Sequence, residues 1–125
     1  YAQEILNQIR DFDDANPIGR GVNWTCTMDV ALRGANWAVA LDLIGGCSAL
    51  DAAELFAAYG NLFDHGRFIR ANLENTYEIT SNHFLSNVVG LHFIAAALPE
   101  TTTALDWMKF TAAVGDTSFA KTQPR

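Results

Sequence analysis

Residues 28–44 read MDVALRGANWAVALDLI, and their apolar spacing predicts one long α-helix that ends at a pair of glycines. Nearly every position in this stretch is apolar except Asp29, Arg33, Asn36 and Asp42. The first three of these follow at steps of four and three, so they form one narrow polar strip. A helix that is apolar on nearly all sides is enclosed by its neighbours, which predicts a fold of packed helices. The polar strip is then either a satisfied internal network or the wall of a cleft.

Four further helices are predicted from the same kind of spacing, at about residues 2–13, 51–73, 83–98 and 103–114. Thr25 or Thr27 is the expected N-cap of the long helix, and Asp51 with Glu54 has the spacing of a capping box. No segment alternates with period two for long enough to indicate a strand. The expected fold class is all-α, built from layered helical hairpins.

Composition limits the possible functions of the chain. It has 125 residues, of which 50% are hydrophobic, and a net charge of −6. This length supports a single core, and the acidic balance argues against nucleic-acid binding. No run of about 18 apolar residues is free of charges, so no membrane span is expected. The chain opens at Tyr1 inside a helical pattern, without a signal peptide, and we interpret residues 1–125 as one helical fragment of a larger domain.

The cysteines and histidines predict neither a disulfide nor a metal site. Cys26 and Cys47 lie 21 residues apart on either side of the long helix. A straight helix holds them roughly 30 Å apart, whereas a disulfide needs Cα atoms within about 7 Å. We therefore expect two free, buried thiols. His65, His83 and His92 show no ligand-like spacing, so no metal and no cofactor is expected.

Ser81-Asn82-His83 is the sharpest local motif, because it lies at a predicted helix start. Helix N-termini carry unpaired N–H groups and a partial positive charge, which attract carboxylates. Asn82 adds two amide donors, and His83 adds a donor or a base. The motif therefore fits a carboxylate-binding site. It also fits an ordinary N-cap followed by a helix-starting histidine, and the residues by themselves favour this second interpretation.

Three blocks of sequence resemble the N-terminal region of the heparinase II/III family of polysaccharide lyases. They are GVNWTCTMDVALRGANW (21–37), FIRANLE (68–74) and SNHFLSNVVGL (81–91). The blocks occur in the order found in the family, and the matched region covers about residues 20–99.

The resemblance implies both an architecture and an activity. The family's catalytic domain is an incomplete α/α toroid, which agrees with helical hairpins, and it is normally followed by β-sandwich domains. Family members cleave uronate-containing acidic polysaccharides, such as heparan or alginate, by β-elimination. A bacterial origin and a periplasmic or secreted location are also implied, because these enzymes are usually exported.

Site residues follow from the resemblance position by position. Asn82 and His83 match the family's Asn-His pair, in which the asparagine binds the substrate carboxylate and the histidine assists it or acts as the base. Both residues are expected at the catalytic site. A chain that holds only this part of a site is expected to be inactive alone.

Further residues match the family as expected substrate contacts. Asn23, Trp24 and Arg33 lie in the first block, where an exposed Trp with an Arg suits sugar stacking and carboxylate pairing. The alternative is a core Trp24 with an internal Asp29–Arg33 ion pair. Glu74 matches an acidic position, where it either binds substrate or anchors the loop that carries Asn82.

The sequence also departs from the family pattern. The family's catalytic tyrosine lies in a Ser…Tyr-His segment, which residues 115–118 do not reproduce, and no tyrosine follows Tyr77. Ser86 stands where some relatives carry an acidic residue three positions after the histidine. Two alternatives to a lyase are therefore a non-catalytic carbohydrate-binding module and a structural helical domain. Attraction of a polyanion to this acidic chain would be local, from Arg33, Arg67 and Arg70.

Overall fold

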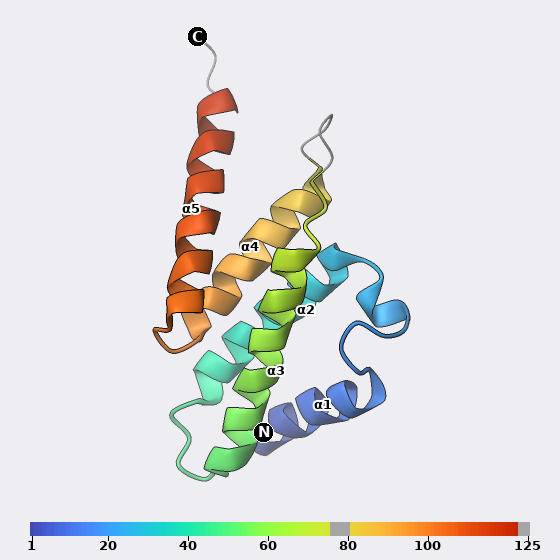
Figure 1. Ribbon diagram of the computed structural model, residues 1–125. Coiled ribbons are helices and arrows are strands. Elements are labelled where there is room, and N and C mark those ends of the chain that lie inside the picture. The colour runs from blue at the N-terminus through green and yellow to red at the C-terminus, as the bar shows by residue number, and fades with distance from the viewer. Residues whose placement is uncertain (76–80, 123–125) are drawn as a thin grey trace.

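A computed structural model describes residues 1–75 and 81–122 of the chain (Figure 1). Those residues form helices and loops without a strand, which confirms the all-α prediction. The elements in chain order are α1 (Ala2–Ala15), the 3₁₀ turn η1 (Val22–Trp24), α2 (Thr27–Ile44), α3 (Ala52–Ala71), α4 (Asn82–Ala97) and α5 (Thr102–Thr122).

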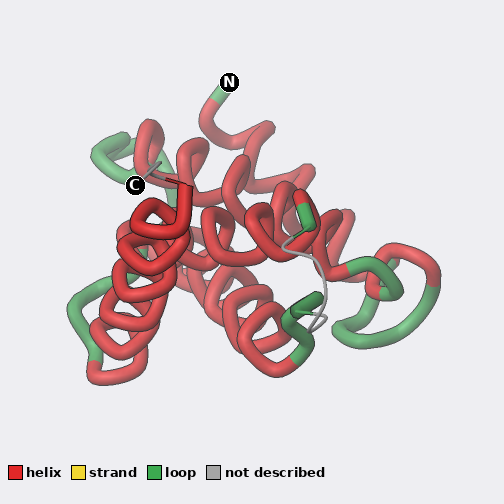
Figure 2. The backbone as a smooth tube through the Cα atoms, turned by 90° about the horizontal axis from the view of Figure 1, so that it is seen from above, coloured by secondary structure: helices red, strands yellow, loops and turns green. Residues whose placement is uncertain are grey.

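The helices from α2 to α5 run alternately in opposite directions, so that α2 pairs with α3 and α4 pairs with α5 as hairpins (Figure 1). The axes of α2 and α4 point the same way, and their amino ends meet where α3 ends. Helix α1 lies across the other end of α3. Figure 2 shows that the described chain consists of these helices and of the loops and turns that connect them.

The contact between α2 and α4 is the centre of the core. Val30 and Ala31 of α2 and Leu91 and Ile94 of α4 are completely buried. Gly90 permits this approach, because a Cβ at that position would lie 2.6 Å from the backbone oxygen of Ala31. Two helix backbones therefore come into direct contact where only a glycine fits.

The prediction that α2 is enclosed by its neighbours is wrong for the described chain, and α4 is uncovered in the same way. Their neighbours cover one side, and large apolar side chains at helical spacing stay exposed on the other. These side chains are Leu32, Val39 and Leu43 of α2 and Leu85, Val89 and Phe93 of α4. An exposed apolar stripe of this kind is typical of a surface that another element covers.

Helix ends differ from expectation where tertiary contacts intervene. Asp51 caps α3 by accepting a hydrogen bond from the N–H of Ala53, as predicted. Glu54 does not complete the capping box, since its carboxylate accepts hydrogen bonds from Gln3 and Arg10 of α1. Helix α5 continues past its expected end near residue 114 and includes Gly115.

The two cysteines are free, but their burial was predicted wrongly. Cys26 is half-buried and Cys47 is exposed, because Cys47 lies in the turn that follows α2 rather than in the core. Among the described residues, no helix is both long enough and apolar enough to cross a membrane.

Replacing Gly90 by alanine tests the central helix contact. The added Cβ forces α2 and α4 apart, and we expect the free energy of unfolding to fall by about 1–3 kcal/mol in chemical denaturation. Gly60, exposed in α3 with open space around it, is the matched control. Gly60→Ala should instead stabilise the protein by about 0.5–1 kcal/mol. Equal effects of the two substitutions would contradict this account of the packing.

Candidate functional site

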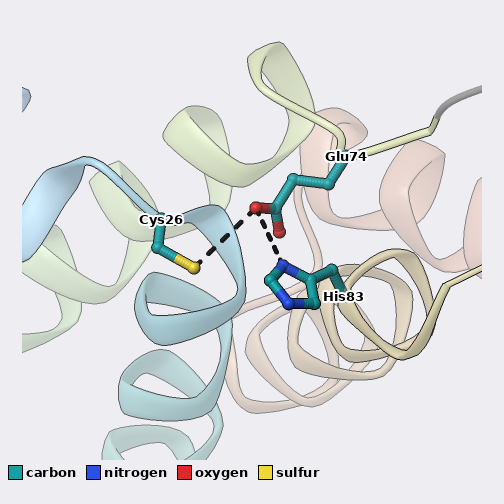
Figure 3. Close-up of side chains that lie close together, drawn as sticks. All are labelled: Cys26, Glu74 and His83. Atoms are coloured by element: carbon teal, nitrogen blue, oxygen red, sulfur yellow. Dashed lines mark hydrogen bonds and ion pairs between the residues drawn. The ribbon is translucent and has the colours of Figure 1, made fainter.

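The carboxylate of Glu74 lies between the amino ends of α2 and α4, just after α3 (Figure 3). Its Oε2 accepts hydrogen bonds from the backbone N–H of Met28, at 2.9 Å, and from Nδ2 of Asn87, at 3.0 Å. Its Oε1 lies 3.2 Å from Nδ1 of His83 and 3.8 Å from Sγ of Cys26. One side chain therefore connects the start of α2, the segment after α3 and the first turns of α4.

Glu74 replaces the local cap that α2 lacks. The N-cap residue of α2 is Cys26, whose side chain makes no capping hydrogen bond. The predicted caps bond elsewhere, because Thr25 donates to the oxygen of Val22 and Thr27 to that of Asn72. A carboxylate at this helix end satisfies an orphan N–H and interacts favourably with the helix dipole.

Asn87 holds Glu74 from the opposite side and was not foreseen as a site residue. It is completely buried in α4. Its Nδ2 donates a hydrogen bond to the Glu74 carboxylate, and its Oδ1 accepts a hydrogen bond of 2.8 Å from the backbone N–H of Glu74. The reciprocal pair satisfies a buried amide that would otherwise be costly. The available sequence signal was an asparagine within an otherwise apolar helix.

Several groups act on the ionisation of Glu74. Partial burial raises its pKa, but hydrogen bonds from Asn87 and His83, the charge of His83 and the N–H of Met28 outweigh this effect. The pKa of Glu74 therefore lies below its ordinary value, and the side chain is a carboxylate at neutral pH.

The Ser81-Asn82-His83 motif lies at the start of α4, as predicted. Ser81 is the N-cap and its Oγ accepts a hydrogen bond from the N–H of Phe84. Asn82 is the first helical residue and is exposed, while 42% of the His83 side chain is accessible. Nδ1 of His83 faces Glu74, and the other ring nitrogen points away from it (Figure 3). The structure thus brings Glu74 and His83 together, next to Asn82.

Asn23, Trp24 and Arg33 form a separate cluster in which the side chains of Trp24 and Arg33 are already engaged. Trp24 is only 4% exposed, and its indole N–H donates to the backbone oxygen of Asn16. The guanidinium of Arg33 donates to Nε2 of His65 at 2.9 Å and to the backbone oxygen of Asn23 at 3.2 Å. Of the two alternatives for Trp24, the structure shows the core residue. Arg33 pairs with His65 rather than forming the ion pair expected with Asp29.

His65 is held neutral inside this cluster. It is completely buried, and its Nδ1 donates to the backbone oxygen of Asn61 at 2.8 Å. Burial, with a further contribution from the charge of Arg33, lowers the pKa of His65 to about 4. Burial also lowers the pKa of Arg33. A neutral imidazole is what lets Nε2 accept the Arg33 hydrogen bond.

A groove of about 580 Å³ lies between α3 and α5, lined among others by Arg67, Arg70, Asn72 and Trp107. None of the expected site residues lines it. Arg70, one of the arginines expected to attract a polyanion, already makes a cation–π contact, because its guanidinium lies 4.2 Å from the centre of the Phe110 ring. We therefore place the candidate site at the amino ends of α2 and α4 and not in this groove.

Comparison with known families identifies the family to which the chain belongs. The sequence profile described as Heparinase II/III N-terminus matches residues 1–121. The chain belongs to the heparinase II/III family. No curated protein and no solved structure matches the sequence significantly. The match to this heparinase II/III N-terminal region includes the two amino ends described above, together with Glu74, Asn82 and His83.

Removing the Glu74 carboxylate should destabilise the heparinase II/III N-terminal region. Glu74→Ala leaves the N–H of Met28 and the buried amide of Asn87 without their acceptor, so we expect a loss of about 2–4 kcal/mol in the free energy of unfolding. Glu100, exposed between α4 and α5, is the control, and Glu100→Ala should change stability by no more than about 0.5 kcal/mol. Similar losses in both variants would refute the connecting role of Glu74.

The buried state of His65 predicts a pH dependence of stability. Its folded pKa of about 4 lies below the ordinary value of 6.5, so the unfolded chain binds this proton more readily. The contribution of neutral His65 is fully present above pH 6.5 and is lost as pH falls towards 4. An NMR titration should show a His65 ring that stays neutral down to about pH 4. A midpoint near the ordinary value would overturn the buried Arg33–His65 contact.

Proposed function

We propose that this chain is part of a polysaccharide lyase that cleaves uronate-containing acidic polysaccharide by β-elimination. Membership of the heparinase II/III family supports the reaction class. The observation that carries the site assignment is the exposed Asn82 beside a half-exposed His83 at the amino end of α4. Amide donors, a helix N-terminus and a histidine in one place match what a uronate carboxylate requires.

The reaction has a specific electrostatic difficulty. The proton at C5 of a uronate lies next to a carboxylate, whose negative charge opposes carbanion formation. Donors that neutralise the carboxylate stabilise the enolate-like intermediate formed when a base takes this proton. The electron pair then expels the glycosidic oxygen at C4, which an acid protonates, and a C4–C5 double bond remains.

Asn82 and His83 have distinct roles in this proposal. The amide of Asn82 donates to the substrate carboxylate, aided by the partial positive charge of the α4 amino end. Glu74 holds His83 by accepting its Nδ1–H, which leaves Nε2, on the side of the ring away from Glu74, as a proton acceptor. His83 then assists at the carboxylate or removes the C5 proton. The family's tyrosine would supply the remaining acid–base function.

Asn23, Trp24 and Arg33 take a supporting role in the proposed site. Burial of the Trp24 ring and the bonds from Arg33 to His65 and Asn23 leave these groups poorly placed to stack on a sugar. They secure the segment that leads into α2, whose first turn is bound by Glu74.

The wider architecture is also proposed. In the family's incomplete toroid, further helices would cover the exposed apolar stripe on α2 and α4, and β-sandwich domains would complete the enzyme. A periplasmic or secreted location fits an enzyme whose substrate is an extracellular polyanion.

Asn82→Ala in the full-length protein tests the proposal. We expect a loss of at least about 100-fold in formation of unsaturated uronate, followed by its ultraviolet absorbance across heparan-like and alginate-like polymers. Asn82 is exposed, so the circular dichroism spectrum and the unfolding midpoint should change little.

Asn36→Ala supplies the control, because Asn36 is an exposed asparagine in the middle of α2. This variant should keep full activity. Retained activity in Asn82→Ala would reject the assignment of Asn82. Binding of oligouronates without any product in the wild-type full-length protein would favour a carbohydrate-binding module instead.

A further inference from the structure

We propose that Cys26, Glu74 and His83 form a binding site for one zinc-like divalent cation. Cys26 immediately precedes α2, Glu74 lies in the segment after α3, and His83 lies in the first turn of α4 (Figure 3). One potential ligand atom from each lies within 4.8 Å of the other two. These are the side-chain types that bind zinc most often, and each faces the same point.

The distances agree with the geometry of tetrahedral zinc. Usual bond lengths of about 2.3 Å to sulfur and about 2.1 Å to oxygen and nitrogen place neighbouring S and O ligands about 3.6 Å apart, and N and O ligands about 3.4 Å apart. The observed separations from Glu74 Oε1 are 3.8 Å to Cys26 Sγ and 3.2 Å to His83 Nδ1. The sulfur and the imidazole nitrogen also lie within 4.8 Å of each other, so all three ligand atoms can face one ion.

The carboxylate is already held as a metal ligand requires. Oε2 is fixed by the N–H of Met28 and the amide of Asn87, so Oε1 is the atom left to coordinate. Asn87 in turn is fixed by the backbone N–H of Glu74. Hydrogen bonds of this kind orient ligands and raise metal affinity.

The ligand set selects the type of ion. A thiolate and an imidazole favour zinc and its borderline-soft neighbours over magnesium or calcium, which prefer oxygen ligands. Binding releases one proton from the Cys26 thiol, and the imidazole proton of His83 moves from Nδ1 to Nε2. The charge of +2 on the ion is then balanced by the negative charges of the Cys26 thiolate and the Glu74 carboxylate, so the site is neutral overall.

The site is accessible and keeps a position free. The Glu74 and His83 side chains are 28% and 42% exposed, so an ion can enter from solvent. Three protein ligands leave the fourth tetrahedral position to water or to an anionic group. If the proposed lyase function holds, a bound ion also keeps a proton on Nε2, so His83 would donate to the substrate carboxylate and not act as base.

Cobalt(II) substitution tests the metal site directly in the full-length protein. Titration with Co²⁺ alone should give a thiolate-to-cobalt charge-transfer band and intense visible bands of tetrahedral cobalt, saturating at one equivalent. Zn²⁺ should displace the cobalt and abolish both signals. Absence of the thiolate band in the wild-type protein would overturn the proposal.

Matched cysteine variants assign the signal. Cys26→Ala should lose the charge-transfer band and weaken binding at least about 10-fold, whereas Cys47→Ala, at the exposed cysteine, should bind like the wild type. Loss of the band in Cys47→Ala alone would place the metal elsewhere and refute the proposal. Asn82→Ala should bind cobalt normally, so failure of the lyase proposal and failure of the metal site give different results.

Discussion

The hydrogen-bonded carboxylate of Glu74 is the constraint on which the arrangement of the amino ends of α2 and α4 depends. It caps α2 through Met28, joins α4 through Asn87 and meets the ring of His83. Helix amino ends carry unpaired donors and positive potential, and α2 has no side-chain cap of its own, so it needs an acceptor from elsewhere in the chain. Glu74 supplies that acceptor from outside both helices. The position of His83 is therefore a consequence of how α2 and α4 are connected.

This connection works together with the packing farther along the same helices. Gly90 lets α4 touch the backbone of α2 at Ala31, which fixes how close the two axes lie. At the amino ends, the same two helices are spaced so that one carboxylate contacts both. The buried pair of Arg33 and His65 holds the segment before α2 in place. In this heparinase II/III family member, the hydrogen bonds that hold the helix ends together also orient the side chains that are proposed to bind substrate.

Prediction from sequence succeeded where the signal was local. The Ser81 cap, the Asp51 cap and the helical periodicity depend on residues within a turn or two of one another. It failed where partners are distant. Glu54 bonded to α1 instead of closing a capping box, because Gln3 and Arg10 offer it charged and amide donors. Neither the site residue Asn87 nor the placement of Cys26 against Glu74 follows from spacing, since their partners lie in other segments.

The sequence by itself determined the all-α class, the approximate helices and the motif at the start of α4, because helix formation and N-caps are governed by neighbours along the chain. Its family-like blocks also marked Glu74 and His83 as residues of interest. Only the tertiary structure decided that these two side chains meet, that Cys26 joins them and that Trp24 is buried. The physical reason is that these contacts join different segments of the chain, and their geometry is set by helix packing, which no local pattern encodes.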